Sequence, residues 1–385
     1  MRVAIVTESF LPSVNGVTNS VVQVVQTLKE AGHEVLIIAP KSPGSTHNGF
    51  PVIRTLSIPL FGFPVALPLF GMKSVLRSYQ PDVVHVAAPF LLGRQGLAVA
   101  RRLNIPSVAI YQTDVSGYLL RYGAKLLTPF YNWLLKRIHS HATITLAPTA
   151  ETASTLQKLG CPNVSIWGRG VDLDLFTPKR KLSNSVRKFK IAIGVKPTDI
   201  VVGYVGRLAP EKQVQRFKEF SDLPNVQFLI VGDGVERAGL EQLFKDERVK
   251  FVGALTGETL ANAYAAMDIF VHCGEEETFG QTIQEAKAAG VPPVAPALGG
   301  PKFLIEDNLT GFLVDPRQPG AYRQALLKLI EDAELRERMG LEARASMLGR
   351  TWKDNNEQLI SHYKSVIEAK QKHLPKPRFQ LRTLA

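Results

Sequence analysis

The chain has 385 residues, of which 45% are hydrophobic and 21% are charged. These values are typical of a soluble globular protein, and the length favours two domains rather than one. Apolar runs stop short of the ~18–20 residues of a membrane-spanning helix. The two cysteines, Cys161 and Cys273, exclude a disulfide framework and a zinc cluster. A buried-strand pattern begins at the third residue in place of a signal-peptide pattern, so we expect a cytoplasmic protein.

The net charge of +12 is unevenly distributed. Residues 1–173 carry 15 Lys and Arg against 7 Asp and Glu, whereas the remaining 212 residues carry 31 against 27. A basic first half suits an anionic partner, which could be nucleic acid, anionic lipid or a phosphorylated substrate. Because neither an RNA-binding aromatic signature nor a recognition-helix pattern accompanies the charge, we expect no nucleic-acid partner.

Strand and helix patterns alternate along the first half of the chain. The stretch RVAIVTE predicts a strand, and the segment 19–32 predicts a helix that ends at Gly32. Further strands are predicted at 33–40, 81–89, 106–114, 142–150 and 164–172. Their continuous apolarity is typical of a parallel sheet covered on both faces, and the alternation with helices predicts a doubly wound α/β domain.

The alternation restarts in the second half. Strands are predicted at 199–206, 226–234, 249–255, 268–274, 291–297 and 311–315. Between the two series lies a polar, basic segment, which places a hinge near 172–198. We therefore predict two Rossmann-like domains, 1–173 and 174–351, that face each other across a ligand-binding cleft. A flexible basic tail is expected at 370–385.

Two cations follow the first strand of the second series. In GRLAPEK, Arg207 and Lys212 lie across a short loop, beyond the carboxyl end of that strand. Side chains at this edge point into the predicted cleft, where an arginine fork and a lysine point charge can neutralise a diphosphate without a metal.

A second loop, with the sequence CGEEETFG, leads into a predicted helix near Gly280. The free N–H groups and positive dipole of the helix start favour a phosphate. Glu277 precedes this start, and Glu285 lies ~7–8 Å inside the helix. One ligand could therefore meet Glu277 through a sugar, the helix through phosphates and Glu285 through a ribose, which is the layout of a nucleoside diphosphate sugar. Glu275 and Glu276 are expected to be a solvated part of the loop.

The first strand of the chain is followed by the loop SFLPSVNGVTNS. Gly16 permits close approach of a ligand to the backbone, and Thr18 or Asn19 could cap the next helix. This loop would present the same anion-accepting geometry on the opposite wall of the cleft.

The sequence motifs of other nucleotide-binding, metal-binding and sugar-cleaving proteins fit this chain less well. VGDGVERAG lacks the third glycine of a dinucleotide-binding fingerprint, and no P-loop pattern occurs. Asp172 and Asp174 form a D-x-D pair at the hinge, for which we favour a structural role over metal binding. A glycosidase also uses two carboxylates, but Glu277 and Glu285 flank a helix start suited to phosphate.

In combination, these motifs resemble glycosyltransferase family 4, whose fold is the two-domain GT-B arrangement. The resemblance rests on GRLAPEK at 206–212, EETFGQTIQEA at 276–286, GG at 299–300 and GRGVDLDLF at 168–176. Other stretches, AIVTESFLPSVNGVTNSV and YQTDVSGY, are similar to actinobacterial α-mannosyltransferases that use GDP-mannose on glycolipids. The resemblance covers almost the whole chain and implies a last helix, at about 352–369, that crosses back to the first domain.

The resemblance assigns roles to particular residues. Arg207 and Lys212 match the family's diphosphate cations, Glu285 the ribose-binding glutamate and Glu277 the glutamate at the sugar hydroxyls. The remaining matches are the amides of Phe279, Gly280 and Gln281 at the sugar, Thr282 and Gly16 at the phosphates, and Leu255 near the base.

The sequence departs from many relatives at one position. Where they carry a histidine beside the sugar, this chain has Gln112, followed by Asp114. Gln112 can hold a sugar hydroxyl but cannot act as a general base, so Asp114 becomes the candidate for orienting or deprotonating the acceptor hydroxyl, with helix capping as its alternative. The family retains anomeric configuration, and we expect no bound metal or cofactor.

The acceptor is expected to enter from the first domain. Residues 56–80 and 117–142 are apolar and aromatic with interspersed cations, a composition suited to peripheral contact with an anionic membrane on its inner face, or to ordinary core helices. The sequence thus predicts a GDP-mannose-dependent α-mannosyltransferase that acts on a lipid-linked acceptor. The alternatives are a UDP-sugar-dependent enzyme that makes a glycosyldiacylglycerol or sulfolipid, and a nucleotide-sugar-binding protein without turnover.

Overall fold

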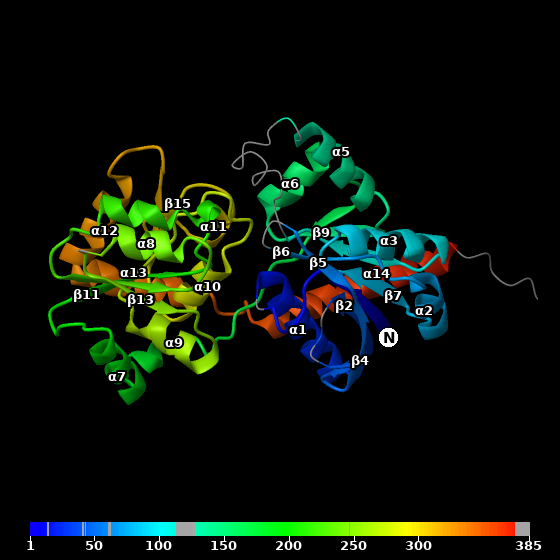
Figure 1. The fold of residues 1–385 in the computed structure, drawn as a ribbon, viewed down its shortest axis with the longest axis horizontal. Coiled ribbons are helices and arrows are strands. Elements are labelled where there is room, and N and C mark those ends of the chain that lie inside the picture. Colours follow the sequence, from blue (N-terminus) through cyan, green and yellow to red (C-terminus); the bar gives the residue numbers. More distant parts are fainter. Residues whose placement is uncertain are drawn as a thin grey trace, which may run out of the picture.

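The computed structural model describes residues 1–13, 15–40, 42, 44–60, 63–112, 126, 128–245 and 247–373. Two lobes lie side by side, each built around its own sheet (Figure 1). The first lobe contains an eight-stranded sheet and the second a six-stranded sheet. All pairs in both sheets are parallel except the short β3–β4 pair, as expected for doubly wound domains.

The sheet of the first lobe has the strand order β10-β9-β8-β7-β1-β2-β4-β3. Its strands are β1 (Arg2–Val6), β2 (Glu34–Pro40), β3 (Thr46–His47), β4 (Phe50–Thr55), β7 (Val83–Val86), β8 (Ser107–Ile110), β9 (Ile144–Ala147) and β10 (Val164–Ile166). The helices are α1 (Gly16–Glu30), α2 (Met72–Tyr79), α3 (Leu91–Arg102), α5 (Thr128–His139) and α6 (Ala150–Lys158). An antiparallel pair, β5 (Ser57–Leu60) and β6 (Phe63–Ala66), precedes α2.

The sheet of the second lobe has the strand order β13-β12-β11-β14-β15-β16. Its strands are β11 (Ile200–Val205), β12 (Val226–Val231), β13 (Val249–Gly253), β14 (Ile269–Val271), β15 (Pro293–Pro296) and β16 (Phe312–Val314). The α-helices are α7 (Asn184–Ala192), α8 (Arg237–Leu243), α9 (Gly257–Ala266), α10 (Gln281–Ala288), α11 (Gly300–Leu304), α12 (Ala321–Glu331) and α13 (Ala333–Ala345). Short 3-10 helices are η2 (Pro178–Leu182), η3 (Pro210–Lys212) and η4 (Val214–Glu219).

Period-two side-chain alternation divides the apolar strands between two cores, one on each face of a sheet. On β11, Val202 and Tyr204 pack into one core, whereas Val201 and Val205 pack into the other. Because both faces of the sheet are covered, the strands carry apolar residues continuously, which is the pattern that identified them in the sequence.

The first helix starts differently from the prediction. Asn15, rather than Thr18 or Asn19, caps α1, because its Oδ1 atom accepts from the amides of Val17 and Thr18 at 3.0 Å each. The cap lies one residue before Gly16, so Gly16 is the first residue of the helix.

Two chain segments connect the lobes and lie against each other. Val171, in the first crossing, forms a parallel bridge with Thr351 in the second. A Cβ atom on Gly170 would lie 2.2 Å from the backbone of Trp352, so the contact requires glycine at this position. The close contact places both crossings at one side of the gap between the sheets.

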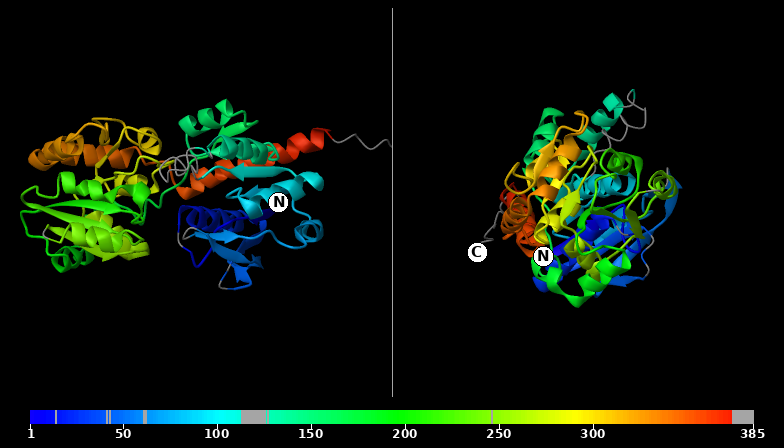
Figure 2. Two further views of the ribbon diagram at one scale, coloured as in Figure 1. Left: turned by 45° about the horizontal axis from the view of Figure 1, so that its top comes forward. Right: turned by 90° about the vertical axis from the view of Figure 1, so that its left-hand side faces the viewer.

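The last helix, α14 (Trp352–His373), returns to the first lobe, and the left view of Figure 2 shows it (red) lying along that lobe. Tyr363 contacts His85 of β7 through its hydroxyl at 2.6 Å, and Asn356 donates to Thr27 of α1 at 2.9 Å. The helix is longer than the predicted 352–369, so the start of the expected tail is helical. Residues 374–385 lie outside the described part of the chain.

The polar segment interpreted as a hinge is largely folded. It forms η2 and α7, which pack against α9, and Arg180 pairs with Glu258 of that helix. The apolar residues Val186 and Phe189 make this contact, but their wide spacing gave no strand pattern. Among the described residues, none of the helices combines the length and apolarity needed to cross a membrane.

Candidate active site between the two sheets

The loop after β11 carries the two predicted cations. Arg207 follows Gly206 and forms an ion pair with Glu211 of η3. The Arg207 side chain is 40% exposed, whereas that of Glu211 is only 4% exposed. A nearly buried carboxylate therefore holds a half-exposed guanidinium at the carboxyl edge of the sheet.

Lys212 and Glu277 join the two loops predicted to form the donor site. Lys212 Nζ donates to Glu277 Oε2 at 2.7 Å, and the two side chains are 20% and 18% exposed. The two residues lie 65 positions apart in sequence, so no local sequence pattern predicts this ion pair. The ion pair brings the diphosphate cation and the sugar-binding carboxylate of the prediction into direct contact.

Glu277 also accepts hydrogen bonds from the backbone directly before helix α10. Its Oε1 atom accepts from the amide of Gly280 at 3.1 Å and, more weakly, from that of Phe279 at 3.4 Å. Burial alone raises the pKa of Glu277, but the Lys212 charge and hydrogen bond, with the positive charge of Arg169, lower the pKa to about 2. Glu277 is therefore an anion at neutral pH, and two of the amides expected at the sugar contact it in this structure.

Glu285 lies on α10 and is 8% exposed. Its Oε2 atom accepts from the hydroxyl of Tyr264 at 2.8 Å. Burial raises the pKa of Glu285 to about 7, although the hydrogen bonds from Tyr264 and Gln281 oppose this shift. Unlike Glu277, Glu285 therefore carries a proton in a substantial fraction of molecules at neutral pH.

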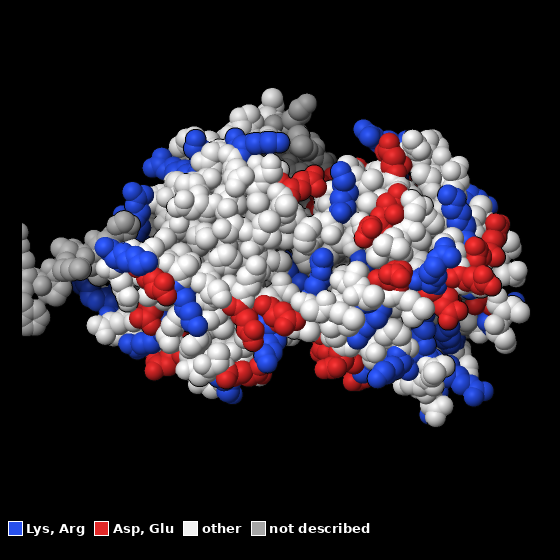
Figure 3. Space-filling view, turned by 180° about the vertical axis from the view of Figure 1, so that it is seen from behind, with Lys and Arg blue, Asp and Glu red and all other residues white. Residues whose placement is uncertain are grey.

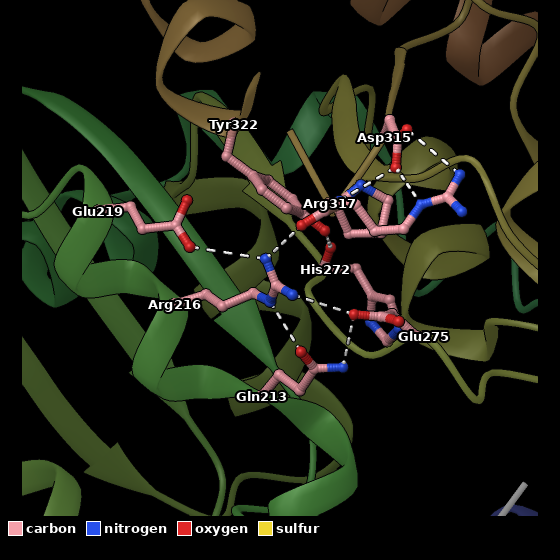
Figure 4. Close-up of polar contacts among 9 residues, drawn as sticks. Gln213, Arg216, Glu219, His272, Glu275, Asp315, Arg317 and Tyr322 are labelled. Atoms are coloured by element: carbon pink, nitrogen blue, oxygen red, sulfur yellow. Dashed lines mark hydrogen bonds and ion pairs between the residues drawn. The ribbon is translucent and has the colours of Figure 1, made fainter. Parts of the chain in front are cut away.

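Glu275 is not the solvated residue that the sequence predicted. Figure 4 shows its carboxylate facing Arg216 and Gln213, which donate to Oε1 at 3.0 and 3.1 Å. Arg216 also donates to the carbonyl of Pro316 at 2.8 Å. The expectation was wrong because the partners lie about sixty residues away in sequence, and the contact fastens the glutamate loop to η4.

The wall contributed by the first lobe contains Gly16 and Gln112. Gln112 is 8% exposed, donates to the carbonyl of Ala87 at 3.0 Å and accepts from Arg169 Nη2 at 2.7 Å. Thr278, in the glutamate loop, donates to the Gln112 carbonyl at 3.1 Å. The two walls therefore touch at Gln112. Asp114 lies outside the described residues.

The remaining predicted residues lie at the same edge of the second sheet. Leu255 lies in the loop between β13 and α9 and is partly buried. Gln281 and Thr282 form the first turn of α10, and the Gln281 side chain donates to the carbonyl of Gly170 at 3.1 Å. The structure thus brings the predicted donor residues of the second lobe to one side of its sheet.

The D-x-D pair forms a turn. Asp172 Oδ1 accepts from the amides of Asp174 and Leu175 at 3.1 and 2.8 Å. Within the described residues, no cluster of three His, Cys, Asp or Glu side chains is arranged to hold a metal ion.

Comparison of this chain with protein-family models and with known proteins shows the family to which it belongs. A model described as "Glycosyltransferase Family 4" matches residues 14–175, and one described as "Glycosyl transferases group 1" matches residues 185–346. A protein of Mycolicibacterium smegmatis named GDP-mannose-dependent alpha-mannosyltransferase is 44% identical over 95% of this chain and 98% of its own. The chain belongs to glycosyltransferase family 4.

Further relatives support the same family. The protein of the same name from Mycobacterium tuberculosis is 42% identical over 95% of this chain and 97% of its own. The sulfoquinovosyl transferase of Arabidopsis thaliana is 31% identical over 88% of this chain and 68% of its own.

The family's GT-B fold is confirmed by solved structures. A sucrose-phosphate synthase from Thermosynechococcus elongatus matches with a TM-score of 0.78 and 21% identity over 96% of this chain and 99% of its own. Anabaena HepE in complex with UDP and glucose matches with a TM-score of 0.76 and 20% identity over 94% of this chain and 99% of its own.

Sequence reasoning missed two residues of this family 4 site. Glu211 was part of the quoted GRLAPEK motif, and its spacing of four from Arg207 was a signal for an ion pair. Arg169 lies in the quoted GRGVDLDLF motif between two glycines, but nothing in the local pattern indicated that its side chain would reach Gln112.

Proposed function

We propose that the chain is an α-mannosyltransferase that moves mannose from GDP-mannose to a glycolipid acceptor at a membrane. The observation that carries this proposal is the 42–44% identity, over nearly all of each chain, to relatives named GDP-mannose-dependent alpha-mannosyltransferase. The charged residues at the carboxyl edge of the second sheet support it, because Arg207, Lys212 and Glu277 offer the groups that a nucleotide sugar needs.

The donor would lie along the second lobe. Arg207 and Lys212 would hold the diphosphate, while Glu277 would accept from sugar hydroxyls and Glu285 from the ribose. Thr282 at the start of α10 and Gly16 at the start of α1 would approach the phosphates, and Leu255 the base. When the bond between the sugar and the diphosphate breaks, these cations and helix ends stabilise the departing charge, which is where electrostatic catalysis has its largest effect.

The acceptor hydroxyl would attack on the face from which the diphosphate leaves, so that anomeric configuration is retained. Gln112 would orient a sugar hydroxyl, and Asp114 is our candidate for receiving the acceptor proton. Because Lys212, Arg207 and two helix starts supply positive charge, the reaction as proposed needs no metal ion or other cofactor.

An apolar surface of the first lobe supports a lipid-linked acceptor. Phe130 and Trp133 of α5 are stacked and are 62% and 53% exposed, and Arg137 lies over the Trp133 ring at 5.3 Å. A mainly apolar cavity of about 100 Å³ lies between α3 and α5, with Gln112 in its wall. An acyl chain at this surface would bring its headgroup toward the cleft.

Peripheral membrane contact on the cytoplasmic side is part of the proposal. In Figure 3, Lys and Arg side chains gather along the upper edge of the first lobe, the edge at which Figure 1 places α5 and α6. Exposed aromatic residues beside cations are suited to an anionic bilayer surface.

The test of the donor is a competition of nucleotides for the pure protein by calorimetry. The proposal predicts that GDP binds at least tenfold more tightly than UDP. Tighter binding of UDP would instead favour a UDP-sugar-dependent glycolipid synthase, a possibility supported by the 32% identity to an alpha-monoglucosyldiacylglycerol synthase of Acholeplasma laidlawii over 83% of this chain. Nucleotide binding without transfer to any lipid would indicate a non-catalytic nucleotide-sugar-binding protein.

A further inference from the structure

Arg169 lies in the first crossing between the lobes, and its backbone is fastened to the second lobe. Its carbonyl accepts from the Gln284 side chain of α10 at 2.9 Å, and the next carbonyl, of Gly170, accepts from Gln281 at 3.1 Å. The Arg169 side chain contacts the first lobe, where Nη2 donates to Gln112 Oε1 at 2.7 Å. This residue therefore spans the cleft between the donor helix and the sugar end of the site.

The guanidinium group of Arg169 lies close to the start of α1 and near the Phe279 ring. A Cβ atom on Gly16, the first residue of α1, would be only 2.7 Å from Arg169 Nη1. Arg169 Cζ also lies 6.0 Å from the centre of the ring of Phe279, which precedes Gly280, the N-cap residue of α10. The start of α1 carries partial positive charge and is capped only by the neutral side chain of Asn15, so it repels a cation at this place, whereas the Glu277 carboxylate lies at the start of α10.

The contacts of Arg169 leave this charge without a close counterion. Within the described residues, Arg207 and Lys212 each form an ion pair with a carboxylate, whereas Arg169 forms none. Its hydrogen bond is to the neutral amide of Gln112, which leaves most of its five N–H donors for another partner. Burial lowers the pKa of Arg169, and the more distant Glu277 only partly opposes this shift.

A partly buried cation beside the positive end of α1, opposed only by the more distant charge of Glu277, costs free energy unless an anion binds next to it. We propose that Arg169 is a third donor-binding cation, which contacts the distal phosphate of the nucleoside diphosphate from the crossing segment together with the start of α1. This inference rests on the proposed nucleotide-sugar transfer. The distal phosphate is favoured over the proximal one because Arg169 contacts Gln112, at the sugar end of the site.

The experiment compares Arg169→Gln with the unaltered protein by calorimetry, using GDP and GMP as probes. Loss of a charged fork to phosphate is expected to weaken GDP binding by roughly tenfold to a hundredfold. Binding of GMP, which lacks the distal phosphate, should change less than about threefold. Arg169→Lys keeps the charge but not the fork, and should recover part of the GDP affinity.

A second variant tests the same contact without removing the charge. Gly16→Ala places a methyl group where Arg169 Nη1 now lies, and the flexible end of the arginine must move. We expect the same selective loss of GDP affinity. The control is Arg187→Gln, which removes an identical charge from an exposed position on α7 and should change neither affinity.

Equal weakening of GDP and GMP by Arg169→Gln, or no weakening of either, would overturn the proposal. Equal weakening with a lower melting temperature would identify Arg169 as a structural residue of the crossing. The same comparison with UDP and UMP separates the two claims. If the unaltered protein prefers UDP, the mannose-donor proposal fails, while a selective diphosphate loss still supports Arg169. An unaltered protein that binds diphosphate no better than monophosphate would contradict the role of Arg169.

Discussion

The two walls of the cleft are built from different chemistry. The wall from the second lobe carries charged pairs, in which Arg207 contacts Glu211 and Lys212 contacts Glu277. The described part of the opposite wall offers a helix start at Gly16, the neutral amide of Gln112 and an apolar cavity. In the proposed function, charge would recognise the donor, whereas shape and apolar contact would recognise the acceptor. Variants of Glu277, Glu285 and Arg216 alter the charged wall, whereas the double variant of Phe130 and Trp133 alters the first lobe alone.

The largest expected effect concerns Glu277. In Glu277→Gln the carboxylate that pairs with Lys212 and accepts from the backbone before α10 is lost, and kcat/KM for mannosyl transfer should fall by roughly a hundredfold to a thousandfold. Steady-state transfer measures this loss. The neighbouring variant Glu276→Gln is the control and should retain activity within about threefold. Undiminished transfer by Glu277→Gln would remove Glu277 from the donor site.

The apolar wall is tested by replacing Phe130 and Trp133 together with serine. Removing two exposed aromatic side chains, each worth about 2 kcal/mol when buried, should weaken partition to anionic vesicles by about a hundredfold or more. Vesicle sedimentation measures this, and GDP affinity should not change. Leu348→Ser, at a position 63% exposed in the second lobe, is the matched control.

Binding of the unaltered protein to the vesicles should also weaken as salt concentration rises, because cations accompany the aromatic residues. If the double variant and the unaltered protein sediment equally, α5 is not the membrane-contacting surface.

The raised pKa of Glu285 should make GDP binding depend on pH near neutrality. Because burial raises the pKa of Glu285 to about 7, its carboxylate becomes a full acceptor for ribose hydroxyls only above that pH. We expect GDP affinity to rise several-fold from about pH 6 to about pH 8. Glu285→Gln should reduce this rise, and comparing the two proteins cancels the ionisation of GDP itself.

Stability should follow the opposite trend with pH. The folded-state pKa of Glu285 lies above its ordinary value, so the folded protein holds a proton that the unfolded chain releases. The unaltered protein should therefore lose stability relative to Glu285→Gln as pH rises from about 4.5 to about 7, which melting curves at several pH values in this range measure. A constant difference in melting temperature would contradict the raised pKa.

The smallest effect is expected from Arg216, which anchors Glu275 and the carbonyl of Pro316. Arg216→Gln should lower the free energy of unfolding by about 1–3 kcal/mol, because partly buried acceptors lose their donor. Transfer activity should fall only a few-fold, since the glutamate loop loosens but Glu277 keeps Lys212. Arg317→Gln, at an arginine 82% exposed and paired with Asp315, is the control and should leave both unchanged.

The sequence predicted the strands buried on both faces, because continuous apolarity identifies them wherever helices cover the sheet. It did not predict β4, whose FPVIRT pattern contains a proline and is only half apolar. Among the site residues, Arg207, Lys212, Glu277 and Glu285 were found from their positions after strands or around a helix start. The sequence did not predict the contacts of Glu275 and Arg169, because their partners Arg216 and Gln112 lie more than fifty residues away.

Transfer itself tests the account most directly. The purified protein is incubated with a bacterial membrane lipid extract and labelled GDP-mannose or UDP-glucose, and the labelled lipid is separated and counted. The proposed function predicts label in lipid from GDP-mannose and little from UDP-glucose, with the labelling rate reduced by roughly a hundredfold or more in Glu277→Gln. Labelling from UDP-glucose in preference to GDP-mannose would contradict it.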